Sequence, residues 1–142
     1  MVKLSEYREY LEAIPAATSG DLVSARSNLE SLLAKIELHS SSEQLAYVLQ
    51  LLADVEAQAG NAEKALSLHE RALVTDSANP LTPLNCAKSL LGRLNQPALA
   101  LARLKVAEAL LASGTWQPNS NDMPREWYQH QIQSVRVQAL QA

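Results

Sequence analysis

Two fifteen-residue stretches of the chain, forty residues apart, follow the same pattern. Residues 19–33 read SGDLVSARSNLESLL, and residues 59–73 read AGNAEKALSLHERAL. Each begins with a small residue and Gly, continues with Asp or Asn, and places Ala five residues after the Gly. A glycine followed by an N-cap residue is typical of the turn between two helices. The repetition predicts a stack of similar helix pairs, because one pair cannot bury its apolar face alone.

The alanine of this pattern aligns three predicted helices with one another. The aligned alanines are Ala25, Ala65 and Ala100, five residues after Gly20, Gly60 and Asn95. Four residues further along come Leu29, His69 and Leu104, and three residues beyond those come Leu32, Ala72 and Ala107. Small residues at such positions let two helices of a pair approach closely, and the larger residue between them fills the gap to the next pair. We therefore expect these rows to lie where helices touch.

An all-helical domain is the fold class that the composition favours. Hydrophobic residues make up 47% of the 142 residues and charged residues 19%, which is enough apolar material for a core and too little charge for a disordered chain. Aromatic residues are only 4%, with no Phe, so the apolar content is mainly Ala and Leu, both good helix formers. We expect one all-α domain over residues 1–142.

Apolar residues at helical spacing and capping residues predict about seven helices joined by short turns, which favours antiparallel neighbours. Their approximate ranges are 5–18, 22–38, 42–59, 62–75, 83–93, 97–113 and 124–141, with a longer loop at 114–123. In the last of these helices, one face carries Tyr128, Ile132, Val135 and Ala139.

Particular residues set the expected helix boundaries. Pro15 should kink the first helix or end it early, leaving an irregular turn after it. Ser40 and Glu43 have the spacing of a capping box. Thr82 and Pro83 are expected to be the N-cap and the first position of the fifth helix, because the missing N–H of proline costs nothing there.

The stretch 46–79 resembles the tetratricopeptide repeat, a helix–turn–helix unit of 34 residues. It departs from the family pattern at Glu56 and His69, where aromatic residues are usual, and at Ser77, where proline is usual. The residues that carry the resemblance are Leu49, Leu52, Ala53, Gly60, Ala65, Ala72 and Asp76.

Two further stretches fit the same repeat less closely. Residues 80–114 fit with one residue inserted at the turn, and residues 6–39 fit least, because Pro15 lies in the first helix and Leu32 replaces the second alanine. The resemblance implies a right-handed superhelix of about three helix pairs. The helix at 124–141 would be the solvating cap that such arrays need.

The resemblance also implies a function, because tetratricopeptide arrays bind a peptide or helix of a partner protein in a concave groove. The first helix of each pair lines that groove, so the chain is expected to be a non-enzymatic protein-interaction module. A groove of Tyr and Leu with few charges suits an apolar or amphipathic segment. In the alternative interpretation, some of these side chains do not line a groove but pack beneath the last helix or between helix pairs. The implied groove residues are Tyr7, Tyr10, Leu11, Ile14, Tyr47, Gln50, Leu51, Asp54, Gln58, Leu81, Leu84, Asn85, Lys88 and Leu91.

One tetratricopeptide subclass binds the C-terminal carboxylate of a chaperone tail through Lys, Asn and Arg. Among the corresponding positions only Asn85 keeps this chemistry, so a carboxylate clamp is not expected. The corresponding positions are Tyr10, Ile14, Leu51, Leu81 and Asn85.

The residues show no constellation for catalysis, for a cofactor or for a metal ion. The three histidines, His39, His69 and His130, lack a second His, Cys or carboxylate at metal-ligand spacing. The chain also lacks a glycine-rich phosphate loop and a nucleophile elbow. We expect no enzyme, no cofactor and no metal, with His69 an interior residue of the repeat.

The charge is small overall but uneven along the chain. The formal net charge is −3, without the basic stripe of a nucleic-acid-binding protein. Residues 1–63 hold 4 Lys and Arg against 10 Asp and Glu, whereas residues 64–142 hold 8 against 5. This asymmetry indicates either ordinary solvated helix faces or a partner whose charge runs opposite along its length.

The chain is expected to be cytoplasmic, without a membrane partner. Its first residues carry charges throughout, unlike a signal peptide, and no apolar run reaches the length of a membrane span. The single cysteine, Cys86, excludes an intramolecular disulfide and is expected to be buried. Trp127 is expected to anchor the last helix onto the third helix pair. In the alternative interpretation, the segment 114–128 is a second contact surface for a partner.

Three roles fit a protein-interaction module of this size. The first is an adaptor or co-chaperone that holds an apolar segment of a client protein. The second is a dedicated bacterial chaperone or neutralising partner of one secreted or toxic protein, since small freestanding arrays resemble bacterial secretion chaperones. The third is a self-associating structural module, such as a homodimer.

Overall fold

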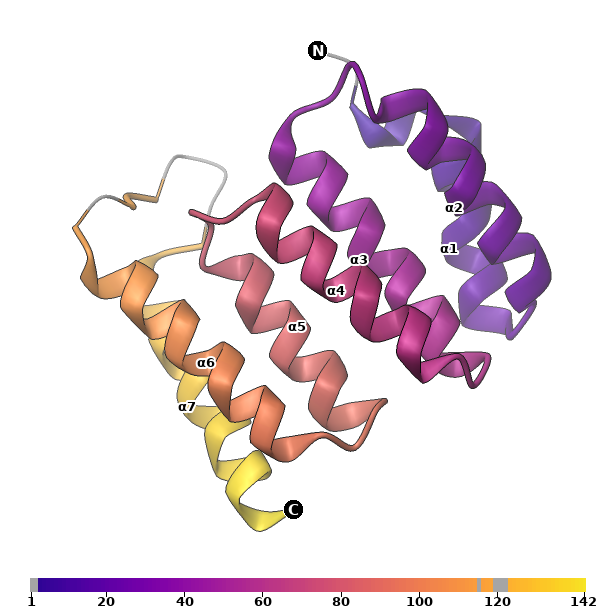
Figure 1. Cartoon of the computed structure of the whole chain (residues 1–142). Helices are drawn as coiled ribbons and strands as arrows, with labels where there is room; N and C mark the ends of the chain where they lie inside the picture. Colours follow the sequence, from indigo (N-terminus) through magenta and orange to yellow (C-terminus); the bar gives the residue numbers. More distant parts are fainter. Residues whose placement is uncertain (1–2, 115, 119–122) are drawn as a thin grey trace. The chain divides into compact units, whose positions relative to one another are not determined.

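The computed structural model describes residues 3–114, 116–118 and 123–142, and within these ranges the fold is all-α, with seven α-helices and no strand (Figure 1). The all-α prediction is therefore confirmed. A short 3₁₀-helix, η1 (Leu4–Glu6), precedes the α-helices. The α-helices are α1 (Arg8–Ser19), α2 (Leu22–Ile36), α3 (Ser42–Gln58), α4 (Ala62–Thr75), α5 (Leu81–Gly92), α6 (Pro97–Ala112) and α7 (Arg125–Gln141).

The helices group into two compact units, residues 1–76 and 77–142. The first unit contains α1 to α4, which correspond to the predicted pairs at 6–39 and 46–79. The second contains α5 to α7, which correspond to the predicted pair at 80–114 and the last helix. The prediction of one domain over residues 1–142 stays a prediction, as does the superhelix.

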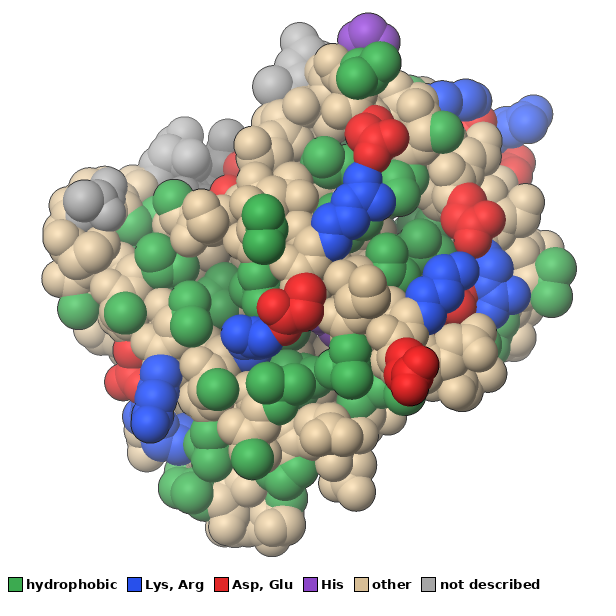
Figure 2. Space-filling view, in the orientation of Figure 1, with side chains coloured by type: hydrophobic (Ala, Val, Ile, Leu, Met, Phe, Trp, Pro, Cys, Tyr) green, Lys and Arg blue, Asp and Glu red, His purple; other side chains and the backbone are tan. Residues whose placement is uncertain are grey.

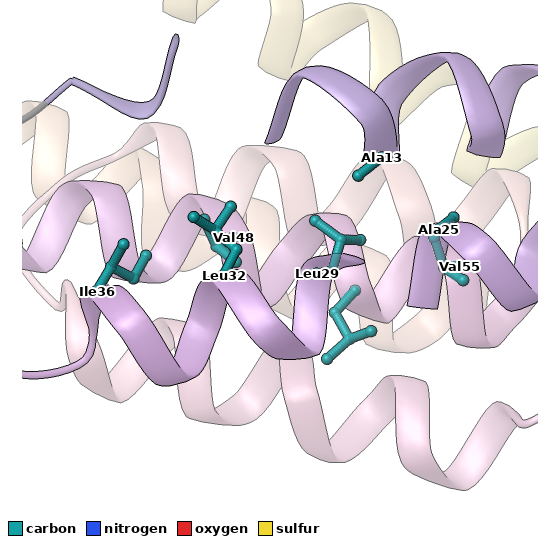
Figure 3. Packing of buried hydrophobic residues seen from close by; sticks show 8 residues of the cluster. Ala13, Ala25, Leu29, Leu32, Ile36, Val48 and Val55 are labelled. Carbon is teal, nitrogen blue, oxygen red and sulfur yellow. The ribbon is translucent and has the colours of Figure 1, made fainter. Parts of the chain in front are cut away.

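In the first unit, each helix packs against the next one along the chain, α1 on α2, α2 on α3 and α3 on α4. Figure 3 shows how side chains of α1, α2 and α3 point into a shared apolar core. Because this core draws on three consecutive helices, it joins the first predicted helix pair to the second. Its buried members are Ala13, Ala25, Leu29, Leu32, Ile36, Val48, Leu52 and Val55.

The three aligned rows of the repeated pattern are buried in the structure. Each residue of the rows is at most 1% exposed, so the expectation that these positions lie at helix contacts is confirmed. This burial includes His69, which is an interior residue as expected. The rows are Ala25, Ala65 and Ala100; Leu29, His69 and Leu104; and Leu32, Ala72 and Ala107.

In the second unit, α7 packs against both α5 and α6. The predicted apolar face of α7 is buried, since its four residues are at most 5% exposed. The burial of this face confirms the helical register expected at the end of the chain. These residues are Tyr128, Ile132, Val135 and Ala139.

The start of the chain differs from the sequence prediction. The helix expected from Ser5 is instead the 3₁₀-helix η1, and α1 begins only after Tyr7, whose backbone is extended. Pro15 lies inside α1 without ending it, so the prediction of an irregular turn after Pro15 was wrong. The α1–α2 contact buries Ala13 two residues before Pro15, and this packing outweighs the hydrogen bond that proline removes.

Two other predicted N-termini are displaced. Ser41, not Ser40, caps α3, because its side chain accepts a hydrogen bond from the Gln44 N–H at 3.2 Å, whereas the Ser40 hydroxyl donates to the carbonyl of Ile36. The helix α5 begins at Leu81, so the predicted N-cap Thr82 is already inside its first turn.

The turns around the repeated glycines form as predicted. Gly20 and Gly60 have φ values of +87° and +86°, the left-handed conformation that ends a helix. Asp21 then caps α2 by accepting a hydrogen bond from the Ser24 N–H, and hydrogen bonding by the side chain and the backbone of Ser24 lowers the pKa of the Asp21 carboxyl. Asn61 occupies the N-cap position of α4, but its side chain makes no capping hydrogen bond and donates to the Glu56 carboxylate instead. Of the predicted loop 114–123, residues 115 and 119–122 lie outside the described residues.

Candidate functional site

The structure divides the predicted groove residues by exposure. Leu11, Tyr47 and Ile14 are exposed, at 56%, 39% and 37%. The half-buried ones are Tyr7, Tyr10, Leu51, Asp54, Leu81, Asn85 and Lys88. Gln50 is 7% exposed and Leu84 is fully buried, so neither presents a side chain to a partner, and their assignment to an open groove was wrong. Gln50 shares one side of α3 with Glu43 and Asp54, so its direction around the helix does not by itself explain its burial.

The first unit presents an aromatic and apolar surface that we call the tyrosine face. Tyr10 of α1 and Tyr47 of α3 join the two helices, with ring centroids 6.5 Å apart and ring planes at 71°. This edge-to-face geometry is the favoured one for aromatic pairs. Beside the pair, Leu11 is 56% exposed and Ile14 is 37% exposed. The face comprises Tyr7, which precedes α1, together with positions that share one side of each helix: Tyr10, Leu11 and Ile14 of α1 and Glu43, Tyr47, Leu51, Asp54 and Gln58 of α3.

The surroundings of Tyr47 raise the pKa of its hydroxyl group. Burial is the main cause that raises the pKa of Tyr47 to about 12, followed by its hydrogen bond with Tyr10 and the negative charge of Asp54. Tyr47 is therefore a neutral hydrogen-bonding group at physiological pH. Tyr10, Tyr47 and Asp54 thus combine two aromatic rings with one carboxylate on a single surface.

A buried carboxylate connects α2, α3 and α4. Glu56 of α3 is fully buried and receives hydrogen bonds from the Arg26 guanidinium of α2 and, at 2.9 Å, from the Asn61 side-chain amide. The ammonium of Lys64 on α4 lies 3.6 Å from the Glu56 carboxylate and 3.6 Å from that of Glu30. Burial alone would raise the pKa of Glu56, but the hydrogen bonds from Arg26 and Asn61 outweigh it and hold the pKa below its ordinary value.

This network was not predicted from the sequence. Glu56 stands at a position where the tetratricopeptide pattern has an aromatic residue, and this departure was its only signal. Arg26 lies thirty residues away, so nothing local connects the two. The network lines an open hollow of about 780 Å³ beside the turn at Gly60. Because the basic groups that line the hollow already bind Glu56 and Glu30, we interpret the network as a structural feature that stabilises the packing of α2, α3 and α4.

Other ion pairs link helices of the same unit. Lys35 of α2 binds Glu9 of α1, and this hydrogen bond lowers the pKa of the Glu9 carboxyl. Arg71 of α4 binds Glu37, the residue that follows α2. Figure 2 shows acidic and basic side chains side by side over α2 and α4. The exposed surface of α2 and α4 is therefore largely balanced in charge, unlike the tyrosine face.

An aromatic cluster organises the second unit. The Tyr128 ring lies 5.1 Å from Trp116 and 5.1 Å from Trp127, both edge-on. The ammonium of Lys88 on α5 lies 5.5 Å from the centre of the Trp127 ring, a cation–π distance. Burial also lowers the pKa of Lys88. Lys88 therefore binds within its own unit, which agrees with the expectation that Trp127 anchors the last helix.

Arg125 holds the segment before α7 against the end of α6. Its guanidinium donates to the carbonyl of Leu111 and, at 3.3 Å, to that of Trp116, and it lies 5.5 Å from the Trp116 ring centre. The carbonyls at a helix C-terminus need such donors. These contacts account for both Trp116 and Arg125 as structural residues.

Within the described ranges, no group of three or more His, Cys, Asp or Glu side chains is placed to hold a metal ion. Cys86 is buried, as expected. Over the same residues, none of the helices is both long enough and apolar enough to cross a membrane. Comparisons of the chain with protein-family models, with curated proteins and with solved structures returned no match.

Proposed function

We propose that the chain is a non-enzymatic protein-binding module, and that the tyrosine face takes an apolar or amphipathic segment of a partner protein. The observation that carries this proposal is the contact of half-buried Tyr10 with exposed Tyr47, with exposed Leu11 and Ile14 on the same side of α1 as Tyr10. Tyrosine anchors bury a large area at low cost in side-chain entropy, and they are enriched at binding hot spots. An amphipathic helix would place its apolar side chains against such a face at helical spacing.

We also propose that α1–α2 and α3–α4 are tetratricopeptide-like repeats. Support comes from the positive φ of Gly20 and Gly60 and from the burial of Ala25 and Ala65 at equivalent positions. In that family the first helix of each pair contributes the binding surface, and α1 and α3 would do so under this proposal. The proposed role is that of an adaptor or co-chaperone in the cytoplasm.

The proposal can be tested with the full chain and a displayed library of random peptides of about 16 residues, enough for four helical turns. Peptides selected on the wild-type chain should lose about tenfold in affinity for Tyr47→Ala and for Leu11→Ala. A matched control is Val74→Ala, since Val74 is 79% exposed on α4, outside the tyrosine face. Circular dichroism should show unchanged helicity in all three variants.

Two results would contradict the proposal. One is that selection enriches no peptide on the wild-type chain. The other is that the enriched peptides bind Tyr47→Ala and Leu11→Ala as tightly as they bind Val74→Ala. In either case the tyrosine face is not a binding surface for peptide segments.

A further inference from the structure

Lys88 of α5 is a half-buried lysine that has no carboxylate partner among the described residues. Its ammonium lies 5.5 Å from the centre of the Trp127 ring on α7, and both residues belong to the second unit. By contrast, the ammonium of Lys35 in the first unit binds the carboxylate of Glu9. Lys88 is therefore partly withdrawn from water with an aromatic ring, rather than a carboxylate, beside its charge.

Two influences act on the ammonium of Lys88. The Trp127 ring attracts it through the ring quadrupole. Burial removes water from the charged form, and this loss lowers the pKa of Lys88. A larger share of the side chain is therefore the neutral amine than in a lysine whose pKa is at its ordinary value. The neutral amine is the form of lysine that reacts with electrophiles.

We propose that Lys88 is a site of lysine acylation, and that acylation releases its contact with Trp127 of α7. The donor class is an acyl phosphate. The neutral Nζ attacks the carbonyl carbon, a C–N bond forms, and the C–O bond to phosphate breaks. The phosphate leaves with the electron pair of that bond, and the proton lost by the nitrogen passes to water. Nothing is oxidised or reduced in this step.

The acylated side chain can no longer hold α7 through its charge. Acylation converts the amine into a neutral amide, which ends the cation–π contact with Trp127. The buried face of α7, which includes Tyr128 and Ile132, still packs against α5 and α6. We therefore expect α7 to stay folded in place but to open more often, because one of its contacts with α5 is lost.

The first experiment measures which lysines of the full chain react. The folded chain is treated with acetyl phosphate at about neutral pH, and acetylation at each lysine is followed over time by peptide mass spectrometry. Lys105 of α6 is the comparison, because it is exposed and belongs to the same unit. Lys88 should be acetylated about threefold faster than Lys105, and the difference should vanish when the chain is unfolded in guanidinium chloride.

The second experiment measures the hold of Lys88 on α7. Lys88→Gln imitates the acylated side chain, Lys88→Arg keeps a cation beside the ring, and Lys105→Gln is the matched control that removes one charge elsewhere in the unit. Hydrogen exchange of the α7 amides should become about threefold faster in Lys88→Gln, the loss expected for one cation–π contact. It should stay close to the wild-type rate in Lys88→Arg and in Lys105→Gln.

Three results would overturn the proposal. In the first, Lys105 is acetylated as fast as Lys88 in the folded chain, so the fold does not select Lys88. In the second, α7 exchanges at the wild-type rate in Lys88→Gln, so the contact with Trp127 does not hold the helix. In the third, Lys88→Arg exchanges as fast as Lys88→Gln, so the charge is not what matters. Each of these results leaves the function proposed for the tyrosine face untouched.

Discussion

Replacing Arg26 by Met is expected to lower the free energy of unfolding of the first unit by about 2 to 3 kcal/mol at neutral pH. Methionine keeps the length and the apolar stem of the side chain but removes the positive charge. The carboxylate of Glu56 then stays buried without its partner from α2. Because breaking a buried ion pair leaves an uncompensated charge, the loss exceeds that of an exposed pair.

The magnitude follows from the surroundings of the two groups. Removing one partner of a fully buried pair costs about 3 to 5 kcal/mol. Here the Glu56 side chain is 1% exposed but that of Arg26 is 30% exposed, and Asn61 and Lys64 still face the carboxylate after the change. These remaining partners reduce the expected loss below that range, to about 2 to 3 kcal/mol.

The effect should depend on pH in a defined direction. The pKa of Glu56 in the folded protein is below its ordinary value of 4.5, so the stability that its charge contributes is present above pH 4.5 and is lost as the pH falls below that value. Once Glu56 is protonated, Arg26 no longer faces a charge. The difference between wild type and Arg26→Met should therefore shrink below pH 4.5.

The measurement is urea unfolding of both proteins, followed by far-ultraviolet circular dichroism, at neutral pH and in the acidic range. A double variant, Arg26→Met/Glu56→Leu, serves as the control because it removes both members of the pair. It should lose about 1 kcal/mol, less than the single variant, since an apolar replacement of a whole buried pair is close to neutral. A single variant that loses less than about 0.5 kcal/mol, or a difference that stays constant in acid, would refute the reasoning.

Three further changes test other features of the first unit. Gly60→Ala should cost about 1 kcal/mol in urea unfolding through its positive φ alone, because a Cβ there meets no atom within 4 Å; a neutral result would contradict the left-handed turn. Ser41→Ala should cost about 1 kcal/mol and Ser40→Ala clearly less, and the reverse order would show that Ser40 is the cap. Tyrosine absorbance during alkaline titration should show a group with a pKa of about 12 that disappears in Tyr47→Phe, and a titration complete near pH 10 would contradict the burial of Tyr47.

Local interactions explain why much of the fold could be predicted from the sequence. A helix boundary such as Gly60 depends on the backbone preference of a single residue. The buried rows through Ala25 and Ala65 depend on spacing within one helix, and so does the buried face of α7. These features repeat every few residues, so they are visible without knowledge of which helices touch.

The candidate site was predictable only in part. The resemblance to the tetratricopeptide repeat placed Tyr10 and Tyr47 in a groove lined by the first helix of each pair, but it did not predict the direct contact of their rings. It also placed Gln50 and Leu84 on an open groove, whereas the structure buries both. Helical spacing gives the direction of a side chain around its own helix, and burial depends on which neighbouring helix covers that direction.

The sequence by itself therefore determined the helices, most of their turns and the rows of residues at which they touch, because these depend on interactions within a few residues. Only the tertiary structure decided that Pro15 stays inside α1 and that Arg26 reaches Glu56. It likewise brought two tyrosines from different helices into contact beside Asp54. In each case the partners are far apart along the chain, and the packing of helices against one another sets the distance between them.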